Sequence, residues 1–315
     1  MNPGQTAGRG RVWAWAQLFR LPNLFTVPAE PLAGFVLALS TSPDSWTRLG
    51  WAMVAALAFY LSGLAWNDYY DYAEDRRQRP HRPLPAGQIP LRTAYAVAWF
   101  TASLGLLFCV VLGGTAIWIG GGLLVAVFFY NRWGKTRRVV GVALLGLCRG
   151  LSMWLGASAV PAATPWAHAP LWMATVGIAA YIAAVSLLAQ REAATHQPGW
   201  VRWAPLFVWV LVALCYAPFV SMTGWIPGAY GLLVLGGAIT AWHAARRLQP
   251  FTAQPSPRIK EVLPPWIGRL IALNCWWSTA VIIGAGPDLP RLWLVAALGA
   301  CWFGNRWTGR WFYAS

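Results

Sequence analysis

The chain consists largely of apolar runs of about 20 residues, the length that a helix needs to cross a bilayer, separated by short polar segments. This pattern predicts an all-α protein, a polytopic transmembrane helical bundle of nine to ten spans. The last expected span is short. We place the spans at roughly 22–40, 47–66, 93–113, 115–130, 139–160, 171–190, 203–221, 227–245, 266–285 and 290–304.

The first 21 residues differ from the rest of the chain because they are polar and basic. They lead into a full apolar run and not into an evident cleavage site, so we expect a retained, cytoplasmic N-terminal segment over 1–21. A single transmembrane domain over 22–315 is expected to follow. The proline-rich stretch 250–265 indicates a loop within that domain.

Charge is rare and unevenly distributed. Only 10% of the 315 residues are charged and 58% are hydrophobic, whereas a soluble domain has about 25% charged residues. Of the 24 Lys and Arg residues, 21 fall in the N-terminal segment and every second loop, while Arg48 and Arg291 fall on the other side. This bias predicts a multi-pass integral protein of the bacterial plasma membrane with a cytoplasmic N-terminus. The net charge of +15 then reflects orientation and contact with membrane lipids, not nucleic-acid binding.

One polar stretch, residues 67–87, contains four of the nine acidic residues of the chain. On a helix, Asn67, Asp68, Asp71 and Asp75 share an arc of roughly 100°. Neighbouring carboxylates repel one another unless they share a cation, and Mg²⁺ prefers such oxygen ligands together with substrate phosphates. The stretch therefore predicts a magnesium site formed by these four residues.

A simpler interpretation of the acidic cluster is a solvated helix end, where acidic residues are common. The cluster follows the second expected span, however, and so lies near the C-terminus of that helix. The helix dipole disfavours anions at that end. This placement favours the cation-binding interpretation.

Basic residues on the same side of the membrane could complete a diphosphate site. Arg82 follows the acids, and Lys135 and Arg138 lie in the loop after the fourth expected span. Basic side chains opposite a carboxylate-bound metal would clamp a diphosphate. The alternative is that these charges only set the membrane topology.

Arg149 lies about 15 Å into the fifth expected span, where a charge costs at least about 2.5 kcal/mol on insertion scales. Such a residue usually faces a cavity and a partner within the bundle, either for catalysis or as a structural ion pair. Glu30, in the first span, is its candidate partner because acids are so scarce. Asn23 is compatible with the wall of a polar pocket.

The Asn-Asp-x-x-Asp-x-x-x-Asp pattern that starts at Asn67, with the following Arg-Pro-Leu-Pro-Ala-Gly, resembles the UbiA superfamily of intramembrane prenyltransferases. RLPNLFTVP in the first span, Tyr130 before Lys135, and GLCRGLSMWLGAS around Arg149 are also similar to that family. The resemblance extends over about 20–199 and more loosely beyond. LCRG and YIAAVSLLAQRE are most similar to its EboC-like branch.

The resemblance implies a bundle of about nine spans around a central cavity, in which two aspartate-rich motifs hold Mg²⁺ against an isoprenyl diphosphate. Together with the arguments above, it assigns catalysis to Asp68, Asp71, Asp75 and Arg149, and metal binding to Asn67, Asp68, Asp71 and Asp75. Diphosphate contacts are expected from Asn67, Arg82, Lys135, Arg138 and Glu192. The substrate cavity is expected to include Asn23, Glu30 and Tyr130.

The second aspartate motif should follow the sixth span, but AQREAATHQPG offers Glu192 as its only acid. His196 is a poor ligand for the hard cation Mg²⁺. Two functions stay open: Mg²⁺-dependent transfer of an isoprenyl group to an unknown acceptor, or a catalytically reduced relative that binds or transports a lipid diphosphate or helps to assemble a small metabolite. A CDP-alcohol phosphotransferase is disfavoured because Tyr72, and not glycine, follows Asp71.

Overall fold

The computed structural model describes residues 3–38, 43–160, 169–190, 203–219, 226–247, 297, 300, 301 and 303. These residues form helices and include no strand, which confirms the predicted all-α class. The elements with their bounds are α1 (Pro3–Leu18), α2 (Leu21–Leu24), α3 (Ala29–Leu37), α4 (Pro43–Tyr70), α5 (Tyr72–Gln78), α6 (Leu91–Leu112), α7 (Thr115–Arg132), η1 (Gly134–Thr136), α8 (Arg138–Ala157), α9 (Ala169–Gln190), α10 (Ala204–Tyr216), η5 (Ala217–Phe219) and α11 (Ile226–Arg247).

Five of these helices, α4 and α6 to α9, are long and apolar enough to cross a membrane. They agree with the expected spans to within a few residues, and α10 and α11 also form where spans were predicted. The spans expected at 266–285 and 290–304 lie outside the described residues, apart from four positions. The total number of spans therefore stays a prediction.

The expected single helix over 22–40 is wrong. The chain instead forms the short helix α2, a turn over 25–28 and the nine-residue helix α3. Pro28 and Pro31 lack the N–H groups that a continuous helix would use at these positions, which favours a break. The carbonyl of Asn23 accepts hydrogen bonds from both the N–H of Thr26, at 3.0 Å, and Oγ1 of Thr26, at 2.7 Å, so this oxygen of the interrupted segment is paired.

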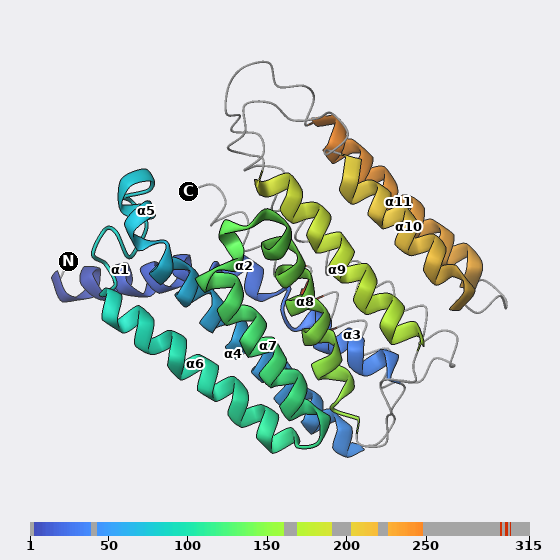
Figure 1. The fold of residues 1–315 in the computed structure, drawn as a ribbon, viewed down its shortest axis with the longest axis horizontal. Coiled ribbons are helices and arrows are strands. Elements are labelled where there is room, and N and C mark those ends of the chain that lie inside the picture. The colour runs from blue at the N-terminus through green and yellow to red at the C-terminus, as the bar shows by residue number, and fades with distance from the viewer. Residues whose placement is uncertain are drawn as a thin grey trace.

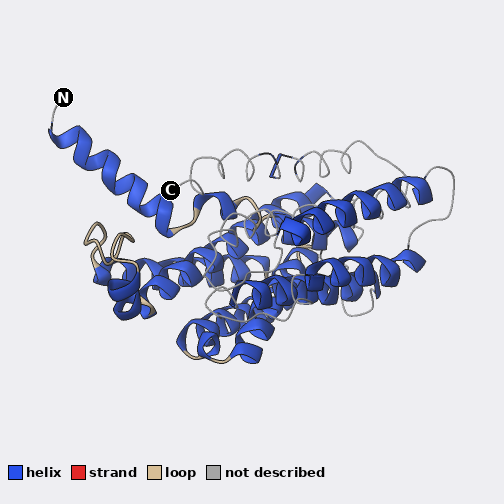
Figure 2. Ribbon diagram, turned by 90° about the horizontal axis from the view of Figure 1, so that it is seen from above, coloured by secondary structure: helices blue, strands red, loops and turns tan. Residues whose placement is uncertain are grey.

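The long helices run roughly parallel to one another, from α6 at one edge to α11 at the other (Figure 1). α4 packs mainly against α6, while α8 packs against α3, α7 and α9. α1 projects away from the bundle (Figure 2). The end of α4, the helix α5 and η1 meet at one end of the bundle, where Lys135 contacts Asp71.

Two glycines allow α3 and α8 to approach closely. A Cβ atom on Gly34 would collide with the backbone of Met153, and one on Gly156 would collide with the backbone of Pro31. Small residues at such contacts are typical of membrane bundles, where close backbone packing replaces much of the hydrophobic driving force. This contact fixes α3 against the helix that carries Arg149.

Arg48 joins three helices at the opposite end of the bundle. From α4 it donates hydrogen bonds of 3.0 Å to the carbonyl of Ala159 and 2.6 Å to the carbonyl of Leu112. These carbonyls lie at the C-terminal ends of α8 and α6, where backbone oxygens lack intrahelical partners and cations are favoured. The sequence suggested no structural role for Arg48.

Candidate active site

The acidic cluster lies where α4 ends and α5 begins. The backbone stays nearly helical through Asp71, because its N–H donates to the carbonyl of Asn67 at 3.0 Å and its own carbonyl accepts from Asp75 at 2.8 Å. Asp68 and Asp75 are buried, and Asp71 is partly exposed. Asn67 donates from Nδ2 to Oδ1 of Asp68 at 3.3 Å. The backbone thus keeps the helical spacing from which the sequence predicted a common face, and the binding of one metal ion by the four residues stays a prediction.

Arg82 reaches the cluster from the loop that follows α5. Its Nη1 lies 2.6 Å from Oδ2 of Asp75 and 4.0 Å from Oδ1 of Asp68. The buried side chains of Leu84 and Ile89 anchor this proline-rich loop beneath its polar residues. One arginine therefore bridges two of the carboxylates that the sequence placed on one helical face.

Lys135 reaches the cluster from η1, directly after α7. Its Nζ donates to Oδ1 of Asp71 and lies 3.5 Å from the carbonyl oxygen of Asn67. The structure thus brings a basic residue of the loop after the fourth predicted span to the acidic residues, as expected. Its role in binding a ligand stays a prediction.

Arg20 is a member of the cluster that the sequence analysis missed. Its Nη2 lies 4.0 Å from Oδ1 of Asp68, although its side chain is 44% exposed. Arg20 adopts a left-handed backbone conformation, with φ of 46°, just before the short helix α2. Arg20 is the first residue of the RLPNLFTVP segment, but the sequence gave no signal for this contact because it depends on the turn between α1 and α2.

Every aspartate of the cluster therefore has a basic partner. Within the described parts of the chain, no three acidic, histidine or cysteine side chains are grouped so that they could hold a metal ion by themselves. The donor chemistry nevertheless fits Mg²⁺, which takes one or two carboxylates and completes its shell with water or substrate phosphates. Of the three carboxylates, that of Asp71 is the most accessible, with 25% of its side chain exposed.

Arg149 and Glu30 form a separate pair, as the scarcity of acids suggested. Nη1 of Arg149 donates a 2.7 Å hydrogen bond to Oε1 of Glu30 across 119 residues of sequence. The guanidinium also lies 5.7 Å from the ring centroid of Tyr60, within the range of a cation–π contact. This pair connects α3, α4 and α8 and has no direct contact with the aspartates among the described interactions.

Among the other predicted residues, the structure describes the side chains of Asn23 and Tyr130 only. Asn23 is buried in α2, and Tyr130 is close enough to the cluster to interact electrostatically with Arg20 and Asp71. Arg138 begins α8, but the position of its side chain is outside what the structure describes. Glu192 and His196 lie outside the described residues, so the expected second motif stays a prediction.

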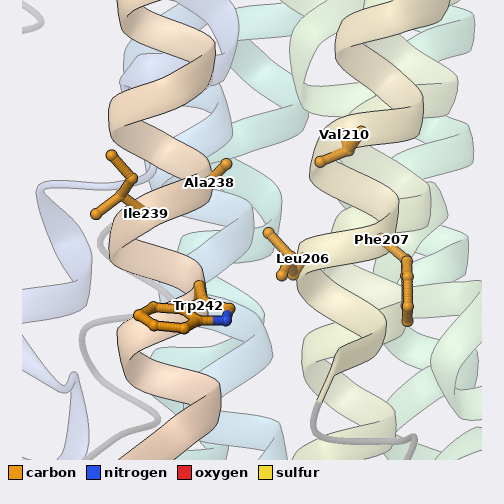
Figure 3. A pocket seen from close by; sticks show the side chains of 6 residues that line it. All are labelled: Leu206, Phe207, Val210, Ala238, Ile239 and Trp242. Carbon is orange, nitrogen blue, oxygen red and sulfur yellow. The ribbon is translucent and has the colours of Figure 1, made fainter.

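An apolar pocket between α10 and α11 is a less suitable place for chemistry (Figure 3). Its lining is formed by six apolar side chains, namely Leu206, Phe207, Val210, Ala238, Ile239 and Trp242. A site for a charged ligand needs polar groups that fix its orientation, and this lining supplies none. The acidic and basic cluster at the end of α4 is therefore the candidate active site.

A family comparison covers the three aspartates, their partners Arg82 and Lys135, and Arg149. Residues 31–260 match the model of the UbiA prenyltransferase family, which is more than half of the chain. The chain belongs to this family. The comparison identifies the family and not a branch within it, so the resemblance to the EboC-like branch stays a prediction.

Curated relatives of this UbiA-family protein are archaeal enzymes. Digeranylgeranylglyceryl phosphate synthase of Pyrococcus abyssi is 28% identical over 177 residues, covering 56% of this chain and 59% of the relative. The enzyme of the same name from Natronomonas pharaonis is 33% identical over 153 residues, covering 48% of this chain and 53% of the relative. The chain spans about half the length of the curated relatives it matches.

Solved structures of UbiA homologues share the fold. A homologue from Aeropyrum pernix K1 has a TM-score of 0.61 at 14% identity, with 84% of this chain and 98% of that chain covered. A homologue from Archaeoglobus fulgidus bound to GPP and Mg²⁺ has a TM-score of 0.56 at 16% identity, with 86% and 99% covered. With the family match and five membrane-length helices, this protein is an integral membrane protein of the UbiA prenyltransferase family.

Proposed function

We propose that this protein transfers an isoprenyl group from an isoprenyl diphosphate to an acceptor and that it requires Mg²⁺. One observation carries the proposal: three aspartates and three basic residues from four separate segments meet at one end of an apolar bundle. A diphosphate with an apolar tail matches this combination, because its head needs both a metal and cations while its tail needs an apolar environment.

The proposed metal ligands are Asn67, Asp68, Asp71 and Asp75. Bound there, Mg²⁺ would neutralise charge on the diphosphate and stabilise its departure. Asp71 would make the first contact because it is the most accessible carboxylate. Lys135, now paired with Asp71, would then be available to donate to a phosphate oxygen.

The transfer step breaks the bond between the allylic carbon and the diphosphate oxygen, and the electron pair leaves with the diphosphate. Arg82 and Lys135 would stabilise this leaving group, because cations fixed in a poorly solvated site stabilise developing negative charge. The nucleophilic atom of the acceptor would form a bond to the same carbon and would pass its proton to the released diphosphate or to water. The relatives' names indicate a lipid-type acceptor for those enzymes, and the acceptor of this protein is to be identified by experiment.

The proposal is tested with the full chain in lipid nanodiscs. The affinity for geranyl, farnesyl and geranylgeranyl diphosphate is measured with Mg²⁺ and with EDTA. We expect Mg²⁺-dependent binding of at least one of these ligands and its loss in Asp71→Ala. Glu74→Ala is the matched control, since Glu74 is an exposed acid only three residues away and contacts none of the three basic residues in the described interactions. The proposal fails if none of the diphosphates binds, or if Asp71→Ala and Glu74→Ala behave alike.

A catalytically reduced protein that binds or transports a lipid diphosphate, or helps to assemble a small metabolite, is the second candidate. The observation that favours it is the single acid, Glu192, in the loop where the family resemblance implies several aspartates. Mg²⁺-dependent binding without release of inorganic diphosphate, across a panel of phenolic and glyceryl-phosphate acceptors, would support this function. Diphosphate release that decreases in Glu192→Ala would support the enzyme instead.

We also propose that the N-terminus and the acidic cluster face the cytoplasm of a bacterial cell. The bias of 21 to two in the distribution of basic residues supports this orientation. Single cysteines at Gln5 and Gly114, in a cysteine-free background, provide the test. A thiol reagent that does not cross the membrane should label only the variant at Gly114 in intact cells. Labelling of only the variant at Gln5 would show the opposite orientation.

A further inference from the structure

The Glu30–Arg149 pair faces the interior of the bundle. The side chain of Glu30 is fully buried, whereas that of Arg149 keeps 15% of its surface exposed. Arg149 lies on the side of α8 opposite the exposed residues Val140 and Leu147, and Glu30 of α3 and Tyr60 of α4 hold its guanidinium from within. The guanidinium of Arg149 therefore points toward α3 and α4 and away from the exposed side of α8.

Two helices give the depth of this pair below the acidic cluster. In α4, Tyr60 precedes Asp68 by eight residues, which corresponds to about 12 Å at 1.5 Å per residue. In α8, Arg149 follows the first residue of the helix by 11 residues, or about 16 Å. Helical side chains lean toward the N-terminus, so the guanidinium lies nearer to the cluster than its own Cα atom. Both helices thus place the charge roughly 12–16 Å below the aspartates along the helix axes.

This distance lies between the extended lengths of short and long isoprenyl chains. At the ~1.2 Å per bond of an extended chain, a geranyl chain spans about 10 Å and a geranylgeranyl chain about 19 Å. With the diphosphate at the aspartates, an inward-directed geranyl chain would end before Arg149. A geranylgeranyl chain on the same path would meet the guanidinium.

We infer that the Glu30–Arg149 pair forms the floor of the donor site and restricts this protein to short isoprenyl diphosphates. The inference rests on the proposed function and names its donor class. A longer chain would press apolar carbon against a guanidinium for which, in the described part of the chain, only Nη1 has a hydrogen bond. This contact would remove water from the charge without replacing its hydrogen bonds, which is costly. Glu30 acts as a positioning residue, because it holds the guanidinium in place.

The test compares the dissociation constants of geranyl and geranylgeranyl diphosphate, with Mg²⁺, for the full chain in nanodiscs. The wild type should bind geranyl diphosphate at least about tenfold more tightly, because the longer chain must either desolvate the guanidinium of Arg149 or leave this path. The double variant Glu30→Leu with Arg149→Met should lose or reverse this preference. Replacing both charges avoids leaving one of them buried and unpaired. Arg48→Met, which removes an arginine from the opposite end of the bundle, should keep the preference.

Each outcome separates the inference from the proposed function. Equal affinity for both diphosphates in the wild type overturns the inference and leaves the proposed function standing, because a long chain must then pass beside the pair. The same holds if the double variant folds and keeps the wild-type ratio of affinities. If neither diphosphate binds, both fail. If the double variant does not fold, equal affinity in the wild type still overturns the inference.

Discussion

Nη1 of Arg82, in the loop after α5, donates a 2.6 Å hydrogen bond to Oδ2 of Asp75, within α5. The side chains are 26% and 7% exposed, so the contact is partly shielded from water. The same arginine nitrogen lies 4.0 Å from Asp68. Arg82 is thereby oriented toward the cluster before any ligand binds, which reduces the loss of side-chain entropy on binding.

Replacing Arg82 should weaken diphosphate binding. Arg82→Gln should lower the affinity for geranyl diphosphate about 10- to 100-fold, since a hydrogen bond to a charged group contributes about 1.5–3 kcal/mol. Arg77→Gln is the control, because Arg77 is exposed and its side chain donates only to the carbonyl of Ala73 among the described hydrogen bonds. Dissociation constants measured in nanodiscs provide the comparison. Equal losses in both variants would indicate a nonspecific effect of net charge.

Removing divalent cations should abolish most of the diphosphate affinity. EDTA leaves the three aspartates paired with basic side chains, so a diphosphate would have to displace the carboxylates from these cations with no metal to receive them. Added Mg²⁺ should restore binding, and Ca²⁺ should restore less, because it is larger and favours more oxygen ligands. Titration of each ion against a fixed concentration of labelled geranyl diphosphate measures this difference. Full binding in EDTA would exclude a metal-dependent site.

Breaking the Glu30–Arg149 pair should cost stability. Glu30→Gln should lower the free energy of unfolding by about 3–5 kcal/mol, because it leaves the Arg149 charge without its buried partner. The double variant Glu30→Leu with Arg149→Met should fall within about 1 kcal/mol of the wild type or exceed it. Unfolding by a denaturing detergent, followed by circular dichroism, measures both. A double variant that is less stable than Glu30→Gln would show that the pair contributes more than mutual neutralisation.

The close approach of α3 and α8 gives a prediction with an internal control. Gly156→Ala should destabilise the protein by about 1–3 kcal/mol or more, because the new Cβ would collide with the backbone of Pro31. Gly121→Ala, in the middle of α7, has no atom within 4 Å of the new Cβ and should stabilise by up to about 1 kcal/mol. The same unfolding assay compares the two variants. Similar effects in both would show that α3 can move away from α8 without loss.

The sequence predicted α4 and α6 to α9 well because each is one apolar run long enough to cross a membrane, and the thickness of a bilayer sets that length. It predicted the first span wrongly. There the apolar run continues through Pro28 and Pro31. Hydropathy measures only how apolar these residues are, whereas their missing N–H groups favour a break in the helix. A proline signal was present in the sequence, but the polar contact of Thr26 with the carbonyl of Asn23 was visible only in the structure.

The candidate site was predictable wherever its residues follow one another on a helix. Asn67 to Asp75 obey helical spacing, so their common face followed from the sequence. Contacts between distant segments were harder to predict. Scarcity of acids identified Glu30 for Arg149, but nothing in the sequence connected Arg20 to Asp68, because surface arginines are numerous and their partners depend on how loops fold.

The pairing of Asp68, Asp71 and Asp75 with three cations means that the cluster carries almost no excess charge of its own. Under the proposed function, a magnesium diphosphate would therefore not be drawn in by a strong field. It would exchange partners: the metal would take carboxylates from the basic residues, and the diphosphate would take the basic residues from the carboxylates. Such a site behaves as a small ion exchanger, and after release its own ions recombine and shield one another from water until the next ligand arrives.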